Sequence, residues 1–375
     1  MRMTLLLAAS AAALLTACSP SAPAPAAEAP KASIGEFGVD LTNADASVKP
    51  GDDFFRYANG HWLTTFQMPA DKARFGSFDA LGEKSENDVK SIIDGFATSA
   101  PAAGSNVAKA ADFYASWMDE ATLETRGIEP LKPYLDEINA INTKQDLLKV
   151  IAKVGYAAPF GMGIEADTAD PKRYAVWGAQ GGLGMPERDY YLEKSEKFDA
   201  YRAAYKTYVT KIFELLGDAN PAASADTVIK FETEIAKGHW TPEELRKPDK
   251  AFKAMSAADF RKLVPNIDLD KFAADAGIGK LDNMVAYGDT SITAGAKLID
   301  TQPIASWKKY LTFHIASDNA PFLTKAFDDA SFEFFNKTLS GVTAKRERWK
   351  RGVRLLDQKI GEALGEAYAA KFYPA

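Results

Sequence analysis

The side chains that could hold a metal or carry acid–base chemistry are few in this chain of 375 residues. There are three histidines, His61, His239 and His314. His239 precedes Glu243 by four residues, and His314 precedes Asp318 by the same step. Two ligands one helical turn apart can begin a zinc site, but a proline between His239 and Glu243 would interrupt the helix. We therefore expect solvated or core-edge histidines and no metal site.

Other catalytic patterns are absent from the sequence. It contains no H-E-x-x-H, no G-x-S-x-G and no phosphate-binding loop. The glycine-rich stretch Gly178–Pro186 does not match a dinucleotide fingerprint. The one cysteine, Cys18, lies near the N-terminus and has a different expected role. The sequence therefore predicts no catalytic residue, no metal ligand and no cofactor within this chain.

The first 17 residues are typical of a bacterial signal peptide. Arg2 precedes a short apolar run, and Leu-Thr-Ala leads directly into Cys18. Small residues before a cysteine are typical of a lipobox, whose cysteine is acylated after cleavage. We expect lipidation at Cys18, although an ordinary secretory signal followed by a chance cysteine is the alternative. Residues 18–40 are rich in proline and alanine and predict a tether.

These features predict a lipoprotein of the cell envelope. Ser19, next to the acylated cysteine, is the residue type that permits sorting to the outer membrane, so we expect a protein that faces the periplasm. A single cysteine allows no intramolecular disulfide. The formal net charge of −6 and the absence of basic blocks argue against nucleic acid as a partner.

Residues 41–375 read as one mainly α-helical body. Apolar residues spaced by three and four predict helices over 77–96, 106–124, 131–141, 144–154, 198–216 and 223–236. Later helices are expected to begin near Ser256, Pro303, Ala320 and Thr343. Residues 159–180 hold two short runs around a polar turn and predict a β-hairpin, and a strand is expected near 284–289.

The end of the chain predicts one long amphipathic helix from Arg348 to Ala375. Its apolar stripe consists of Trp349, Val353, Leu356, Ile360, Ala363, Ala367 and Ala370. The charged residues off that stripe suit solvent; they are Lys350, Arg354, Asp357 and Glu362. We expect Arg348 and Arg351 to pair with acidic residues.

Seven stretches resemble, in order, the neprilysin-type zinc metallopeptidases and their bacterial periplasmic relatives. They are KPGDDFFRYANGHW (49–62), RFGSFDAL (74–81), RGIEPL (126–131), GLGMPERDYYL (182–192), FETEIAKGHW (231–240), RERWKRGV (346–353) and GEALGEAYAAKFYP (361–374). The resemblance covers about residues 40–375. Where eukaryotic members often carry disulfide cysteines, this chain has Gly51, Asn59 and Gly352.

The resemblance implies the large, multi-helix N-terminal domain of such a peptidase, which acts as a lid over a cavity that admits oligopeptides. The family's H-E-x-x-H helix, its glutamate ligand and its zinc belong to a C-terminal catalytic domain that these residues do not include. We therefore expect a chain that is inactive alone and that partners with a catalytic half if one is separately encoded.

Arg74 is the one functional residue that the resemblance transfers to this chain. The matching arginine in the family binds the C-terminal carboxylate of the substrate, and a guanidinium suits that contact. A surface or structural ion pair, for example with Asp79, is the alternative. A second arginine of some relatives falls at Gly82, so a clamp of two arginines is not expected.

The remaining motif residues are expected to be structural. Phe54, Tyr57 and Trp62 are interpreted as core aromatics, and Arg188 with Asp189 as an ion-paired turn.

The leading hypothesis is the substrate-enclosing half of a lipid-anchored zinc metalloendopeptidase. A non-enzymatic, peptide-binding envelope lipoprotein is the alternative, and a general envelope scaffold is the third.

Overall fold

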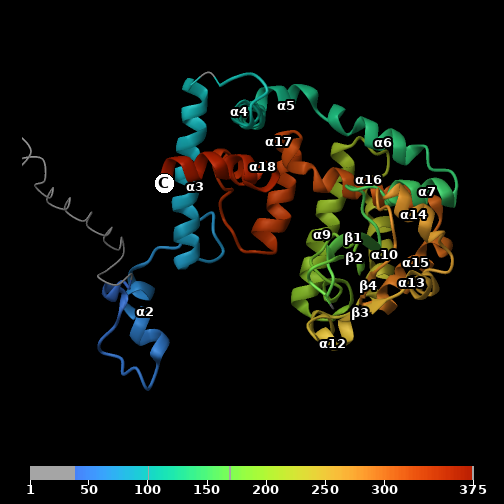
Figure 1. Cartoon of the computed structure of the whole chain (residues 1–375), viewed down its shortest axis with the longest axis horizontal. Helices are drawn as coiled ribbons and strands as arrows, with labels where there is room; N and C mark the ends of the chain where they lie inside the picture. The colour runs from blue at the N-terminus through green and yellow to red at the C-terminus, as the bar shows by residue number, and fades with distance from the viewer. Residues whose placement is uncertain (1–38, 100, 169, 374–375) are drawn as a thin grey trace, which may run out of the picture. The chain divides into compact units, whose positions relative to one another are not determined.

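The computed structural model describes residues 39–99, 101–168 and 170–373 (Figure 1). The chain divides into two compact units, Met1–Met68 and Pro69–Ala375. The predicted signal peptide, Cys18 and nearly all of the predicted tether lie outside the described residues.

The described part of the first unit holds two helices, η1 (Leu41–Asn43) and α2 (Phe54–Thr65). Asp53 caps α2, because its carboxylate accepts a hydrogen bond from the Arg56 amide at 2.9 Å. Gly60 is the one residue of α2 that is buried. The predicted core position is wrong for Phe54, which is 68% exposed. So short a segment cannot enclose its own aromatic side chains.

Three helices of the second unit pack around a core of their own (Figure 1). They are α3 (Ser77–Ser99), α4 (Asn106–Met118) and α18 (Arg348–Phe372). Their buried apolar residues are Val89, Ile93, Ala110, Val353, Leu356 and Leu364. The spacings of three and four residues place these side chains on one face of each helix.

A larger core lies among α9 (Glu196–Leu215), α10 (Pro221–Gly238), α15 (Asp289–Thr301) and α16 (Ile304–Asp318). Helix α16 is its central element, since Trp307, Tyr310 and Phe313 are all fully buried. A helix that is apolar around most of its circumference must be enclosed by others. The larger core therefore forms around α16.

A four-stranded sheet packs beside these helices, in the order β1-β2-β4-β3. The strands are β1 (Phe160–Ala166), β2 (Tyr174–Gln180), β3 (Phe252–Met255) and β4 (Met284–Tyr287). The predicted hairpin is confirmed as the antiparallel β1–β2 pair, and the strand expected near 284–289 is β4. Gly178 of β2 leaves room for Phe260, because a Cβ there would lie 2.5 Å from the Phe260 Cζ.

Shorter helices connect these parts. They are α5 (Glu120–Arg126), η2 (Glu129–Leu131), α6 (Lys132–Asn139), α7 (Lys144–Ile151), α8 (Asp189–Leu192), α11 (Pro242–Leu245), α12 (Pro248–Ala251), α13 (Ala257–Leu263), α14 (Leu269–Asp275), η3 (Ala320–Phe322), α17 (Lys325–Ser331) and η4 (Phe332–Thr338). The last of these, η4, is a π-helix that continues directly from α17.

Most predicted helices are confirmed within a few residues, including α3, α7, α9 and α10. The single helix predicted over 106–124 is wrong. It divides into α4 and α5 at Asp119, whose carboxylate accepts a hydrogen bond from the Thr122 amide at 3.0 Å and starts a new helix. The helix expected from Thr343 begins at Arg348.

Helix α18 keeps the predicted stripe only in its first half. Val353 and Leu356 are buried as expected, but Ile360 has φ −139° and ψ 30°, which are not helical angles. Beyond this kink Leu364 is the buried residue, Ala363 and Ala367 are half-buried, and the predicted buried position of Ala370 is wrong, because that residue is exposed.

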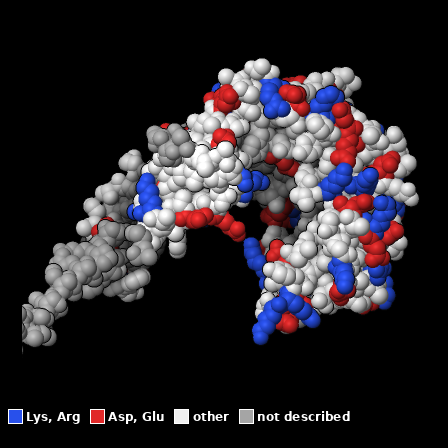
Figure 2. Space-filling view, turned by 45° about the horizontal axis from the view of Figure 1, so that its top comes forward, with Lys and Arg blue, Asp and Glu red and all other residues white. Residues whose placement is uncertain are grey.

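The space-filling view shows lysines, arginines, aspartates and glutamates interspersed over the face displayed (Figure 2). The described residues include no helix that is both long enough and apolar enough to cross a membrane.

Candidate functional site

Arg74 lies in the segment that leads into α3. Its side chain is exposed, and among the described residues it has no hydrogen-bond or ion-pair partner. The alternative pairing with Asp79 is therefore not formed. The neighbouring cation differs, since the Lys72 ammonium is 2.9 Å from Glu83 and 5.1 Å from the centre of the Phe75 ring. Among the described residues the Arg74 guanidinium thus has no partner, whereas the nearby Lys72 ammonium is already paired with Glu83.

The segment that carries Arg74 is tied to the rest of its unit. The amides of Thr343 and Ala344 both donate to the Ala70 carbonyl at 3.0 Å. These bonds connect the approach to α3 with the approach to α18. The segment that carries Arg74 is therefore held at both ends. Backbone hydrogen bonds to Ala70 hold it before Arg74, and helix α3 begins at Ser77 after Arg74.

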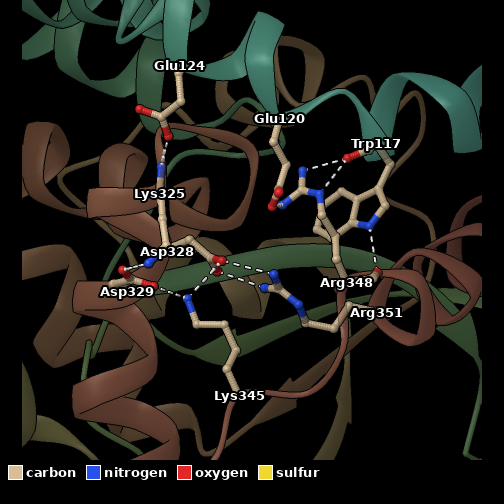
Figure 3. Close-up of polar contacts among 9 residues, drawn as sticks. All are labelled: Trp117, Glu120, Glu124, Lys325, Asp328, Asp329, Lys345, Arg348 and Arg351. Carbon is tan, nitrogen blue, oxygen red and sulfur yellow. Dashed lines mark hydrogen bonds and ion pairs between the residues drawn. The ribbon is translucent and has the colours of Figure 1, made fainter.

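A network of ionic residues joins α17 and α18 (Figure 3). Its centre is the buried carboxylate of Asp328, which accepts two bonds from Arg351 at 2.8 and 2.9 Å and one from Lys345 at 3.0 Å. Asp329 accepts from Lys345 at 2.5 Å and also from Lys325. The expected pairing of Arg351 with an acidic residue is confirmed.

Trp117 connects this network to α4. Its indole Nε1 donates to the Arg348 carbonyl at 2.9 Å, and the Arg348 guanidinium Nε donates to the Trp117 carbonyl at 2.9 Å. The guanidinium carbon lies 4.5 Å from the centre of the indole ring, and Arg348 also pairs with Glu120 at 3.1 Å (Figure 3). The expected pairing of Arg348 is confirmed as well.

A cavity of about 390 Å³ opens beside this network. Its apolar lining consists of Trp117, Pro321, Phe322, Phe332 and Leu355. Its charged lining consists of Asp328, Lys345, Arg346, Arg351 and Arg354. The sequence patterns predict no cavity here, and the helical periodicity puts Arg354 only on the solvent side of its helix. The run of basic residues from Lys345 to Arg354 was the available signal.

A second polar cluster lies inside the larger core. The carboxylate of Glu232 is fully buried and accepts bonds from Tyr191 at 2.7 Å, Tyr205 at 2.8 Å and His314 Nε2 at 2.7 Å. Burial, reinforced by the Glu232 charge, raises the pKa of both tyrosines well above the ordinary value. Both hydroxyls therefore stay protonated and donate. Glu232 could have been found as a carboxylate on the apolar face of a predicted helix.

The histidines do not form a metal site. His314 is bonded to Glu232, and His239 Nε2 lies 3.1 Å from the Gly181 carbonyl. Burial lowers the pKa of His239 to about 4, so the ring is neutral at pH 7 and donates through Nε2. Within the described ranges no three histidine, cysteine, aspartate or glutamate side chains could hold one metal ion. The part of the chain that the structure describes therefore offers no ligand set for a zinc ion.

The predicted ion-paired turn at Arg188 and Asp189 is wrong. No ion pair joins these residues, and the buried Arg188 Nε has no hydrogen-bond partner within the described part of the chain. Arg188 instead directly precedes the short helix α8 and caps it without a side-chain bond.

Comparison with known protein families assigns this chain to a family. The family described as Peptidase family M13 matches residues 50–375. The chain belongs to peptidase family M13. The resemblance in sequence motifs is thereby confirmed, and with it the mainly helical N-terminal domain of this family.

The M13 relatives are distant in sequence and about twice as long. Human endothelin-converting enzyme 1 is 26% identical over 344 residues, which are 88% of this chain and 44% of that enzyme. An endothelin-converting enzyme homologue of Locusta migratoria is 26% identical and is covered to 49%. The chain therefore spans about half of the length of these curated relatives.

Solved structures share the fold. The zinc metalloprotease Zmp1 of Mycobacterium tuberculosis, in complex with an inhibitor, superposes with a TM-score of 0.84 at 29% identity. The match covers 90% of this chain and 52% of Zmp1. PepO of Lactobacillus rhamnosis superposes with a TM-score of 0.72 over 88% of this chain and 52% of PepO, but at 16% identity it supports the fold alone.

Proposed function

We propose that this chain is the N-terminal, substrate-enclosing half of a lipid-anchored zinc metalloendopeptidase that cleaves oligopeptides. The observation that carries the proposal is the likeness of 90% of this chain to about half of Zmp1, the zinc metalloprotease of Mycobacterium tuberculosis. The family match from residue 50 to the end supports the same assignment.

In this proposal the hydrolytic chemistry is supplied by a catalytic half outside these 375 residues. Zinc held by two histidines and a carboxylate would activate a water there. The described residues offer no such ligand set, and their histidines are bound to Gly181 and Glu232 or exposed. The contribution of this chain is then to bind and enclose the peptide, and we expect no hydrolysis by the chain alone.

Arg74 is the residue proposed to hold the peptide's C-terminal carboxylate. An exposed guanidinium without an internal partner is available to form two parallel hydrogen bonds to a carboxylate. The segment that carries it is held by backbone bonds to Ala70, so little ordering is needed on binding.

Cys18 is proposed as the lipid attachment point, and the outer membrane, facing the periplasm, as the location. The sequence pattern around Cys18 supports this assignment. Mass spectrometry of the protein purified from membranes should find a diacylglyceryl-modified Cys18 as residue one, and a Cys18→Ala variant should leave the membrane fraction.

The function is tested by peptide binding to the full chain. Fluorescent oligopeptides with a free C-terminus should bind, and their amidated twins should bind about tenfold more weakly. Arg74→Ala should weaken binding of the free-terminus peptide about tenfold and abolish this preference.

Arg56→Ala is the matched control, because Arg56 is also exposed and its variant loses the same charge. Equal affinity of Arg74→Ala and the native chain would refute the role of Arg74. Zinc-dependent hydrolysis by the chain alone would refute the assignment of catalysis to another half.

A further inference from the structure

The cavity beside the ionic network is lined by five helical elements of the second unit, α4, η3, α17, η4 and α18. Trp117 lies in the last turn of α4, Phe322 ends η3, and Asp328 lies on α17. Phe332 and Asn336 lie on the π-helix η4, and Arg354 lies on α18. A π-helix is rare and is frequently found at functional sites. This π-helix forms part of the wall of the cavity.

The charged lining of the cavity is unbalanced. Four cations line it, Lys345, Arg346, Arg351 and Arg354, against the one anion Asp328. Asp328 is already engaged by Arg351 and Lys345. The lining therefore favours an anionic occupant.

One of the four cations has no partner of its own. Arg346 is bound to Glu86, and Arg351 to Asp328. Arg354 is exposed and, within the described ranges, makes no hydrogen bond or ion pair. Its guanidinium can therefore form a bidentate contact with a ligand without giving up an existing one.

Two carboxamide side chains that line the cavity with Arg354 also have no hydrogen-bond partner among the described residues. The side chains of Asn336 and Gln358 line the same cavity, and neither makes a hydrogen bond to any described residue. Each carries an NH₂ group that can donate to a carboxylate oxygen. The polar side of the cavity thus offers three donors that the fold leaves unused.

The opposite side of the cavity is aromatic. The Trp117 and Phe322 rings meet edge to face with centres 5.6 Å apart, and Pro321 and Phe332 extend this surface. Aromatic walls with a few polar groups are typical of sites that take a ligand with both an apolar and a polar part. A lone inorganic anion would leave this aromatic side without a contact.

We propose that this cavity binds a carboxylate of an oligopeptide next to an apolar side chain. Arg354 pairs with the carboxylate, Asn336 and Gln358 donate to it, and the apolar side chain packs on Trp117 and Phe322. The inference rests on the proposed function in taking peptides as ligands, and it adds a second carboxylate site, separate in sequence from Arg74. The carboxylate comes from an acidic side chain or from the peptide terminus.

Fluorescence anisotropy with the full chain tests the proposal and distinguishes these two sources. The side-chain arm uses an amidated, fluorescein-labelled peptide with Leu-Glu at its centre and a twin with Leu-Gln. The terminus arm uses a peptide with no acidic side chain and a free or amidated C-terminus.

We expect one arm to lose about tenfold in affinity with Arg354→Gln. Gln358→Glu, which keeps the side-chain size and adds an anion, should weaken the same arm. Lys359→Gln is the matched control, because Lys359 is exposed on the same helix, does not line the cavity and loses the same charge. Arg74→Ala should leave the loss caused by Arg354→Gln unchanged in size.

The outcomes separate this proposal from the proposed function. Suppose that the free-terminus peptide binds through Arg74, but that neither Arg354→Gln nor Gln358→Glu changes the affinity of any peptide in either arm. The cavity is then not a carboxylate site, and the proposed function stands. If Lys359→Gln weakens binding as much as Arg354→Gln, the effect is one of general charge and the cavity assignment is wrong. If no peptide of either arm binds the native chain, both proposals fall.

Discussion

Arg351 of α18 binds Asp328 of α17 through two parallel hydrogen bonds, with Nη1 at 2.8 Å and Nη2 at 2.9 Å from the carboxylate oxygens. Both side chains are largely shielded from solvent, with exposed fractions of 21% and 11%. A pair of this geometry fixes the orientation of the two helices as well as their separation. It is the main polar contact between the end of the larger core and the helix that closes the chain.

Loss of either partner of this pair should destabilise the protein. Arg351→Ala leaves the Asp328 carboxylate buried with only Lys345, and we expect a cost of about 3 kcal/mol in the free energy of unfolding. Urea denaturation followed by helical circular dichroism measures it. Lys325→Ala, which removes an exposed lysine of the same network, is the control and should change little. An unchanged urea midpoint for Arg351→Ala would contradict the structural role of the pair.

Two glycines of α18 should respond oppositely to alanine. A Cβ at Gly352 would lie 2.5 Å from Cδ1 and 2.8 Å from Nε1 of Trp117, whereas a Cβ at Gly365 meets nothing within 4 Å. We expect Gly352→Ala to destabilise by about 2 kcal/mol through overpacking. Gly365→Ala should stabilise by about 0.5–1 kcal/mol through helix propensity. The urea midpoints of the two variants, each compared with the native chain, test both expectations. A shift of the same sign for both variants would contradict the packing of Gly352 against Trp117.

The neutral state of His239 should make stability depend on pH. Burial lowers its pKa from 6.5 to about 4, so the unfolded chain binds the proton more readily than the folded chain. The stability linked to this group is full above about pH 6.5 and is lost as the pH falls toward 4, by up to about 3 kcal/mol.

His239→Gln keeps a donor for Gly181 and cannot titrate, so its loss of stability between pH 7 and pH 5 should be smaller than that of the native chain. The difference between the two unfolding curves across this range measures the effect. His61→Gln removes an exposed histidine and should keep the native pH dependence. Parallel curves for His239→Gln and the native chain would show that His239 is not buried in its neutral form.

The stability of the N-terminus of α7 should depend on the hydroxyl group of Thr143. Thr143 Oγ1 accepts from the Asp146 amide at 3.1 Å, and Asp146 accepts from the Thr143 amide at 2.9 Å. This reciprocal pair is a capping box, so Thr143→Ala should cost about 1 kcal/mol. Thr324, which precedes α17 without a side-chain cap bond, supplies the control. If Thr324→Ala lowered the urea midpoint as much as Thr143→Ala, the cost could not be assigned to the capping box.

The sequence alone was sufficient for those parts of the fold that depend on neighbours along the chain. The stripes of α3, α9 and α10 and the hairpin of β1 and β2 arise from local spacing and turn residues. Strand β3 was missed, because it has four residues and its partner β4 lies about thirty positions later in the chain. The parallel β2–β4 pair was missed for the same reason, since no local pattern encodes it.

In the candidate site, too, features set by the local sequence could be predicted, and features set by contacts between distant segments could not. Arg74 could be proposed from a short motif, and the acidic partners of Arg348 and Arg351 from their charge. The identities of those partners, Glu120 and Asp328, depend on where distant helices meet. The cavity that Arg354 lines could not be predicted, because its walls come from five helical elements spread over more than two hundred residues.

The kink at Ile360 divides α18 into two parts with different anchorage. Before it, the helix is held by Arg348, Arg351 and the buried Val353 and Leu356. After it, Leu364 is the one fully buried contact. Backbone amides in the first part should therefore exchange with deuterium only on global unfolding, while those beyond Ile360 exchange through local fraying that leaves the rest of the protein intact. Helix α18 would then behave in solution as two units of different lifetime, with the boundary at one residue.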